Sequence, residues 1–393
     1  MHTLVLTLQP DHMKPFFFSS TALEYPVIRR GLSSSVVMPL MLCCLFLSGC
    51  DSNEPEQIFE FSPREATCSI PIENIREGGV GKDVIPALSD VPFVDASAIS
   101  YLSDFDRVIG FMIDDNAYAI PHNILWFHEI INFEVDGVAL AMTYCPLTGS
   151  SMAFNRNVIQ GEEFGVSGLL WNNNLIMFDR TSSESLWPQM DRRADCGPRL
   201  GATLDMHPVI EITWAGWKAL YPDSQVLSNQ TGFNIGYTSV NYPYGNYEDP
   251  DNDGLLFDME IDRRRPPKAR LLGIPDNRLG GTAFLFSELD NGAPYNVVHS
   301  LEDIGPVVVF WDNTFHSAMA YSPRIGNERF NFEVQGEQIK DIETGSTWQV
   351  DGLAIEGPLA GTRLDPIDRA YVSFWFAWAA FHAETQIWEA PRR

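Results

Sequence analysis

Lysine is scarce in this sequence, and basic residues as a group are heavily outnumbered. Lys and Arg together number 26 against 52 Asp and Glu, which gives a formal net charge of −26. After residue 50 the lysines are Lys82, Lys218, Lys268 and Lys340. A surface this acidic repels nucleic acid and anionic lipid headgroups. The composition therefore argues against a nucleic-acid partner and is typical of a solvated protein outside the cytoplasm.

Several motifs that carry familiar chemistry are missing from the sequence. No glycine-rich phosphate loop, Walker-type lysine or dinucleotide fingerprint follows an expected strand. The segment around Ser167-Gly168 does not complete a G-x-S-x-G elbow, because Leu169 stands at the position of the last glycine. The segment that begins at His128 has Asn132 where a zinc protease needs its second histidine. These gaps argue against nucleotide use, α/β-hydrolase chemistry and metalloprotease activity.

The apolar segment near the N-terminus is too short to be a permanent membrane span. Residues 36–50, VVMPLMLCCLFLSGC, end in the small-residue pattern before a cysteine that a lipoprotein signal peptidase recognises. We therefore predict that residues 1–49 are a signal peptide and that Cys50 becomes a lipidated N-terminus. The mature protein would then be anchored to a membrane in the periplasm or at the cell surface. An ordinary signal peptide, or a short anchor that happens to end in cysteine, is the alternative.

Cysteine is also sparse, at six residues in the whole chain. Two leave with the signal peptide and Cys50 carries the lipid, so the usable thiols are Cys68, Cys145 and Cys196. Outside the cytoplasm an odd number indicates one disulfide and one free thiol. The sequence does not identify which two pair.

A worn internal duplication is the strongest pattern that the sequence does contain. Residues 138–154, VALAMTYCPLTGSSMAF, are answered by residues 305–321, GPVVVFWDNTFHSAMAY, and later segments recur in the same order. The alignment pairs Trp187 with Trp348, Trp217 with Trp378, and Cys145 with Asp312. We expect two homologous units packed as a pseudo-symmetric pair. Positions that the halves share then indicate packing, and positions that differ indicate where one half kept a function.

Turn and strand signals predict a β-rich α+β fold built from two antiparallel units with short helices. Hairpins are expected at residues 107–120 and at residues 133–144, where Asp-Gly separates two apolar runs. Short aromatic helices are expected at residues 213–221 and 372–382. The predicted domains are a signal peptide (1–49), a lipidated N-terminus and tether (50–80), a first repeat unit (81–231), a connector with an Asp-rich loop (232–275) and a second repeat unit (276–393).

The motifs YCPLTGS, FGVSGLLWNNNLIMFDR, SLWPQ, GPLAGTRLD and WFAWAAFH together resemble an uncharacterised prokaryotic family, domain of unknown function 3179. The resemblance covers roughly residues 80–390. It implies a fold and, because members are often exported, a location, but no assigned reaction. Members commonly read Tyr-Cys-Pro-Leu-Cys-Gly, whereas this chain has Thr148 in place of the second cysteine. A redox disulfide or a two-cysteine metal chelate at this motif is therefore in doubt.

Cys145 is the leading candidate for a functional site, with His128 and Glu129 one hairpin before it. A cysteine and a histidine on neighbouring elements suit a thiolate–imidazole pair, or two ligands of a soft metal such as copper or zinc. Alternatively, His128 is a hydrogen-bonded core residue and Cys145 a small buried hydrophobe.

A second candidate is the Asp-rich segment DPDNDGLLFDME, which satisfies the calcium-loop pattern D-x-D-x-D-G-x5-E. Asp249, Asp251, Asp253 and Glu260 would supply the hard oxygen ligands that calcium prefers. The flanking residues do not look helical, so an EF-hand is not expected. A plain solvated loop is the alternative.

These features favour a lipid-anchored extracytoplasmic binding protein with a site centred on Cys145 and His128. A thiol-dependent enzyme and a non-catalytic scaffold or partner-binding lipoprotein are the alternatives. Whether the chain is an enzyme stays open at this point.

Overall fold

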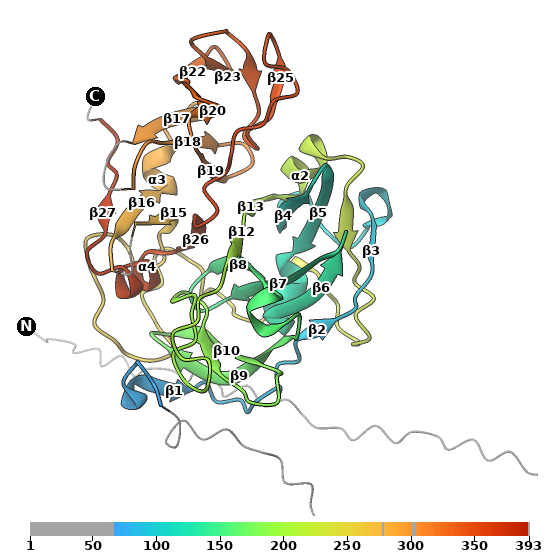
Figure 1. Cartoon of the computed structure of the whole chain (residues 1–393), viewed down its shortest axis with the longest axis vertical. Helices are drawn as coiled ribbons and strands as arrows, with labels where there is room; N and C mark the ends of the chain where they lie inside the picture. The colour runs from blue at the N-terminus through green and yellow to red at the C-terminus, as the bar shows by residue number, and fades with distance from the viewer. Residues whose placement is uncertain (1–66, 277–278, 301–303, 392–393) are drawn as a thin grey trace, which may run out of the picture. The chain divides into compact units, whose positions relative to one another are not determined.

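The computed structural model describes residues 67–276, 279–300 and 304–391 (Figure 1). Backbone contacts divide the chain into residues 1–59 and 60–393, and all of the described residues belong to the second unit. The predicted signal peptide, residues 1–49, and the predicted lipid-bearing Cys50 lie outside the described residues. Within the described ranges, no helix is long and apolar enough to cross a bilayer.

The described chain is rich in antiparallel β-sheet and has four short α-helices, which confirms the predicted fold class. The local turn signals explain why. Asp136 and Gly137, between the paired strands β6 (Ile130–Val135) and β7 (Val138–Cys145), have positive φ angles of 50° and 76°. A two-residue turn with both angles positive matches the right-handed twist of the strands it joins.

The first half follows a fixed order of elements. In chain order these are η1 (Ile72–Asn74), β1 (Ile75–Glu77), β2 (Leu88–Ser89), β3 (Phe93–Asp95), η2 (Ala96–Ala98), β4 (Arg107–Ile113), β5 (Asn116–Pro121), α1 (His122–His128), β6, β7, β8 (Ser150–Asn155), η3 (Arg156–Ile159), β9 (Phe164–Trp171), β10 (Asn174–Asp179), β11 (Leu186–Pro188), β12 (Met206–His207), β13 (Ile210–Thr213), α2 (Trp214–Leu220) and β14 (Gln225–Leu227).

The second half begins after a long connector whose regular structure is η4 (Ser239–Asn241). Its elements are β15 (Arg270–Pro275), β16 (Gly281–Leu285), α3 (Phe286–Leu289), β17 (Tyr295–Ser300), β18 (Val307–Asp312), β19 (Ser317–Tyr321), β20 (Arg324–Ile325), β21 (Glu328–Arg329), β22 (Phe332–Gln335), β23 (Gln338–Asp341), β24 (Thr347–Trp348), β25 (Ala354–Glu356), β26 (Tyr371–Phe374), α4 (Trp375–Phe381) and β27 (Gln386–Ile387).

The two halves repeat one pattern of strand pairing. In the first half β4 pairs with β5 and β13, and β14 joins β5 in parallel. In the second half β15 pairs with β16 and β26, and β27 joins β16 in parallel. The runs β6-β7-β8 and β17-β18-β19 also correspond, as do β9-β10-β11 and β22-β23-β24. This agreement supports the predicted duplication, for which superposition of the halves is the direct test.

Matching tryptophans make matching hydrogen bonds. Trp217 Nε1 donates to Ser224 Oγ at 2.9 Å, and Trp378 Nε1 donates to Thr385 Oγ1 at 2.7 Å. All four side chains are buried. The shared tryptophans therefore act in packing, as their recurrence in both halves indicated.

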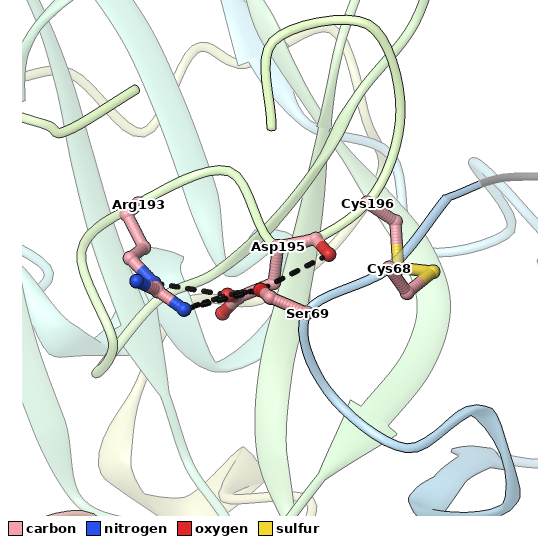
Figure 2. The surroundings of a disulfide bond; sticks show 5 residues. All are labelled: Cys68, Ser69, Arg193, Asp195 and Cys196. Atoms are coloured by element: carbon pink, nitrogen blue, oxygen red, sulfur yellow. Dashed lines mark hydrogen bonds and ion pairs between the residues drawn. A yellow bond between two sulfur atoms is a disulfide. The ribbon is translucent and has the colours of Figure 1, made fainter. Parts of the chain in front are cut away.

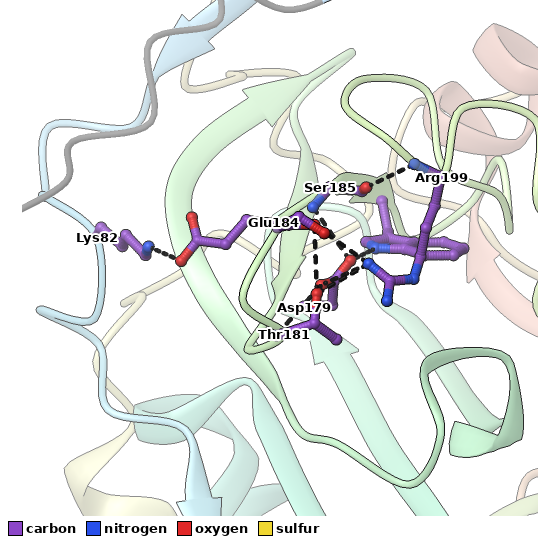
Figure 3. A network of polar contacts seen from close by, with 8 residues as sticks. Lys82, Asp179, Thr181, Glu184, Ser185 and Arg199 are labelled. Atoms are coloured by element: carbon purple, nitrogen blue, oxygen red, sulfur yellow. Dashed lines mark hydrogen bonds and ion pairs between the residues drawn. The ribbon is translucent and has the colours of Figure 1, made fainter.

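The tryptophans of β11 and β24 follow the same rule. Trp187 Nε1 donates to Asp179 Oδ2 at 2.8 Å, and Trp348 Nε1 donates to Asp341 Oδ2 at 2.9 Å. Figure 3 shows Asp179 within its network, where its carboxylate also accepts the backbone N–H of Ser185 at 3.1 Å. Each buried carboxylate thus orders the turn that leads into its tryptophan strand.

The largest sheet contains strands of both halves. Its strand order is β2-β6-β7-β8-β26-β15-β16-β27, with β12 beside β8. The junction is reciprocal: Phe374 N of β26 donates to Thr148 O at 2.8 Å, and Thr213 N of β13 donates to Phe315 O at 3.3 Å. In each half, the end of one strand therefore donates a hydrogen bond to the turn between two strands of the other half.

Two predicted boundaries differ from the structure. The helix expected at residues 372–382 starts only at Trp375, because residues 371–374 form β26 and pair with β15. The connector expected at residues 232–275 includes β15, so the second set of strands begins at Arg270. In both cases a long-range strand partner takes up residues that a local pattern assigns elsewhere.

Candidate functional site

Cys145 is the last residue of β7 and lies in the hydrophobic core. It is a free cysteine, 1% exposed, and its thiol donates to Asn173 O at 3.8 Å. Burial, together with the nearby charge of Glu129, raises the pKa of this thiol to about 11. The thiolate form that a nucleophile or a metal ligand needs is therefore disfavoured at neutral pH.

His128 ends α1 and has other partners. Its Nδ1 lies 2.8 Å from Pro86 O and its Nε2 lies 2.7 Å from the Tyr237 hydroxyl, so both ring nitrogens are engaged. Burial lowers the pKa of the imidazole. These contacts are those of a hydrogen-bonded core histidine and do not support a Cys145–His128 pair.

Glu129 is the predicted site residue that the structure does bring toward Cys145. It follows α1 with a positive φ of 56°, and its side chain is buried. Burial raises the pKa of its carboxyl to about 8. Burial raises the pKa of the Tyr244 phenol, and the nearby charges of Glu129 and Cys145 also raise it. Tyr244, which belongs to the connector, therefore lies close to both residues. The connector therefore covers this end of β7.

The remaining two thiols form the disulfide. Cys68 and Cys196 are joined across 128 residues of chain (Figure 2). Beside the bond, Asp195 O accepts the backbone N–H of Ser69 at 2.8 Å, and Arg193 Nη2 lies 2.7 Å from Asp195 Oδ1. The prediction of one disulfide and one free thiol is thus met, with Cys145 as the free one.

The Asp-rich loop is organised by contacts of its own. Asp249 Oδ1 accepts the backbone N–H of Asp251 at 3.0 Å. The buried ammonium of Lys268 donates to Tyr247 O and Gly254 O, both at 2.9 Å. The carbonyls at this turn thus already face a cation of the chain.

Metal coordination gains no support from the structure. Among the described residues, no group of three His, Cys, Asp or Glu side chains is placed to hold a metal ion. Calcium at Asp249, Asp251, Asp253 and Glu260, and copper or zinc at Cys145, therefore stay predictions.

A second group of polar side chains lies next to Cys145, since its neighbour Tyr144 belongs to the group. The sequence motifs did not indicate this group. Six side chains from both halves and the connector meet in it, and we call them the charged cluster. They are Arg107 of β4, His122 of α1, Tyr144 of β7, Glu211 of β13, Glu248 of the connector and Arg270 of β15.

Glu211 is the central acceptor of the charged cluster and is only 5% exposed. Arg270 Nη2 donates to its Oε1, and Arg107 Nε lies 3.6 Å from the same oxygen. Ser151 Oγ donates to its Oε2 at 2.8 Å. Burial alone would raise the pKa of this carboxyl, but Arg270, His122 and Arg107 lower it overall. Glu211 is therefore held as a carboxylate by groups on four different elements.

His122 is the residue of the cluster that lacks hydrogen bonds. It is fully buried, and neither ring nitrogen has a hydrogen-bond partner among the described residues. Its Nε2 lies 3.6 Å from Glu211 Oε2, and its ring packs on Tyr144 with centroids 4.5 Å apart. Burial lowers the pKa of His122 to about 4. Arg270 Nη1 is likewise buried without a described partner. Unsatisfied buried polar atoms are rare in folded proteins, and a bound water or ion is one of the groups that satisfy them.

The second half has an arginine at one matching position and aromatic or aliphatic side chains at the others. Arg107 and Arg270 correspond, since each opens its strand three residues before a glycine that faces a tryptophan. The other cluster positions of the first half, and that of Ser151 beside them, have different residues in the second half. By position within matching elements, His122, Tyr144, Ser151 and Glu211 correspond to Phe286, Trp311, Ala318 and Val372. The ring contact persists, because Phe286 and Trp311 pack with centroids 4.9 Å apart.

This comparison of halves is the signal that could have found the cluster in the sequence. The rule that differing positions indicate function singled out Cys145 because its counterpart is Asp312. The same rule, applied to the strands on either side, also singles out His122 and Glu211. Their counterparts fall outside the clearly repeated motifs, so the structure was needed to align them.

The fold and the site define a β-rich protein of antiparallel sheets with a partly buried, mixed-charge cluster built from both halves and the connector. A family model described as "Protein of unknown function (DUF3179)" matches residues 82–385. The chain therefore belongs to this family, as its motifs indicated. No curated protein and no solved structure matches the chain.

Proposed function

We propose that this protein is a lipid-anchored extracytoplasmic binding protein whose ligand site is the charged cluster. One observation carries the proposal. The carboxylate of Glu211 and the unsatisfied ring of His122 are buried where the matching half has Val372 and Phe286. Buried charges generally cost stability compared with apolar packing of similar volume. A fold that packs these positions with apolar residues elsewhere thus has a reason other than stability to keep them polar here.

The thiol-dependent alternatives gain no comparable support. Cys145 sits among core side chains with a raised thiol pKa, and His128 is engaged by Pro86 and Tyr237. We therefore place the proposed ligand site in the neighbouring charged cluster and not at Cys145 and His128.

Ligand binding by the soluble domain, residues 60–393, tests the proposal. Acetate, phosphate, glycine and glucose represent a carboxylate, a phosphate, a zwitterion and a neutral polyol. We expect at least one of them to raise the melting temperature of the wild type, because a ligand that binds the folded state stabilises it. His122→Phe, which installs the counterpart residue, should keep the fold and abolish that shift. No shift with any probe, or an equal shift in the variant, would contradict the proposal.

The lipid anchor is tested separately in the full chain. Cys50→Ser removes the residue that we propose is acylated, so the protein should leave the membrane fraction while residues 60–393 remain folded. Membrane association that survives both the substitution and a salt wash would mean that another anchor operates.

A further inference from the structure

Glu248 differs from the other members of the charged cluster because the connector supplies it. Between β14 and β15 the described regular structure is the three-residue η4, so Glu248 reaches the cluster on an irregular segment. Its side chain is 21% exposed, whereas that of Glu211 is 4% exposed. Glu248 thus occupies the solvent-side position of the cluster, and Glu211 lies beneath it.

The contacts of Glu248 are those that proteins offer to a bound carboxylate. Arg107 Nη2 donates to its Oε2 at 2.6 Å, and the Tyr144 hydroxyl donates to its Oε1 at 2.8 Å. Both carboxylate oxygens therefore accept a short, charge-assisted hydrogen bond. Burial alone would raise the pKa of Glu248, but Arg107 and Arg270 lower it to about 2.

The charges of the cluster balance only while Glu248 is in place. Without it, Arg107 and Arg270 face the single carboxylate of Glu211, and His122 is neutral because its pKa is lowered. One positive charge would then be left in a partly buried site of a protein whose net charge is −26. A desolvated charge of this kind favours an anion strongly.

The polar atoms near Glu248 exceed those that its own carboxylate satisfies. The ring nitrogens of His122 and the Nη1 of Arg270 are buried without a described partner. A ligand with a further polar group beside its carboxylate would satisfy them, which the Glu248 side chain does not do.

From these observations we infer that the charged cluster is a binding site for a small monocarboxylate and that Glu248 of the connector occupies it as an internal competitor. The inference rests on the proposed function and names the ligand class of that site. A single negative charge restores the balance of the cluster, whereas a phosphate dianion would leave an excess negative charge next to Glu211. Ligand binding then requires the connector to withdraw Glu248 from Arg107 and Tyr144.

The test uses the soluble domain with Glu248→Ala and acetate as the probe. Removing Glu248 leaves Arg107 and Tyr144 without their acceptor, so the melting temperature should fall. Added sodium acetate should restore it, and sodium chloride at the same ionic strength should not. Glu260→Ala, which removes an exposed carboxylate from the same connector, is the matched control and should not respond to acetate.

Affinity gives a second measurement that does not depend on the loss of stability. Glu248→Gln keeps the shape of the side chain and removes its charge. The apparent affinity of a blocked site is its intrinsic affinity multiplied by the fraction of molecules in which the site is open. Titration calorimetry should therefore show acetate binding to Glu248→Gln at least roughly tenfold more tightly than to the wild type. An acetate response no larger than that of chloride in Glu248→Ala, together with unchanged acetate affinity in Glu248→Gln, would overturn the inference.

The two proposals can fail separately. If glucose or another probe stabilises the wild type through His122 while acetate does nothing in the Glu248 variants, the cluster is a ligand site and the carboxylate assignment is wrong. If acetate rescues Glu248→Ala equally well when His122→Phe is added, acetate replaces the Glu248 carboxylate without using His122. The proposed ligand site, which includes His122, is then wrong, and the competitor role of Glu248 stands.

Discussion

Arg107 and Arg270 occupy the same place in matching strands, yet both point their charge at the single carboxylate of Glu211. Both matching strands β4 and β15 carry an arginine at this place. On the neighbouring strands β13 and β26, only one of the two matching positions carries a glutamate, because the counterpart of Glu211 is Val372. Breaking a buried ion pair by removing one partner typically costs 3–5 kcal/mol. The asymmetry of the site therefore resides in its carboxylates and in His122, while the arginines are common to both halves.

His122 makes the stability of the fold depend on pH. Its pKa is lowered by burial from 6.5 in the unfolded chain to about 4 in the folded chain, so between these values the folded state binds fewer protons. Stability should therefore fall as the pH drops from 6.5 toward 4. His122→Phe should flatten this part of the profile, as measured by urea unfolding at several pH values. Tyr144→Phe, which adds or removes no group that titrates there, should keep the slope.

Cys145 should be a slow thiol. Because burial raises its pKa to about 11, we expect iodoacetamide to modify it at pH 7 on the order of 100-fold more slowly than free cysteine, and at an ordinary rate once the chain is unfolded. Peptide mass spectrometry over time measures this. Modification faster than free cysteine, slowed by His128→Ala, would restore the thiolate–imidazole interpretation.

The sequence predicted none of the six side chains of the charged cluster as site residues. It identified Cys145 and Glu129, which the structure does bring near each other, because both belong to one hairpin and the helix before it. It missed Glu211 and Glu248, since each reaches the cluster from a segment more than sixty residues from Tyr144 and neither belongs to a known motif. Which distant segments meet depends on the fold, and local sequence patterns do not indicate it.

At the scale of elements, hairpins and short helices could be predicted and strand partners could not. The Asp136-Gly137 turn sets the conformation of its hairpin by itself. The order of the largest sheet, by contrast, depends on β26 pairing with β8 across more than two hundred residues. The pairing of β26 with β15 explains why the expected helix at residues 372–382 begins late.

Two glycines let the matching helices approach their strands. A Cβ on Gly110 would lie 2.0 Å from Trp217 Cζ3, and a Cβ on Gly273 would lie 2.2 Å from Trp378 Cζ3. Alanine at either position should therefore lower the free energy of unfolding by about 1–3 kcal/mol or more through overpacking. Gly81→Ala is the control, since its nearest contact would be an ordinary 3.6 Å to Val84 Cγ2. Equal stability of all three variants in urea would refute the close packing.

At the scale of the whole molecule, the disulfide ties the N-terminal edge of the described chain to the loop after β11. The Cys68–Cys196 bond spans 128 residues, and chain entropy predicts a stabilisation of roughly 4–5 kcal/mol for a loop of that length. A reductant should lower the unfolding midpoint accordingly. The double variant Cys68→Ser/Cys196→Ser should show the lower midpoint from the start and no further response to the reductant. A wild type indifferent to reduction would contradict this role.

Because β26 lies between β8 and β15, the largest sheet is one continuous hydrogen-bonded surface shared by both halves. Neither half is therefore a portable module. A gene fragment ending before β15 would encode a protein in which β8 keeps β12 but lacks its β26 partner at Ser151, and an unpaired stretch of edge recruits other strands. Two separately expressed halves have complementary edges instead, which makes the connector a natural cleavage point for a split protein that reassembles. The charged cluster would form only on reassembly, since Arg270 and Glu211 come from opposite sides of that cut.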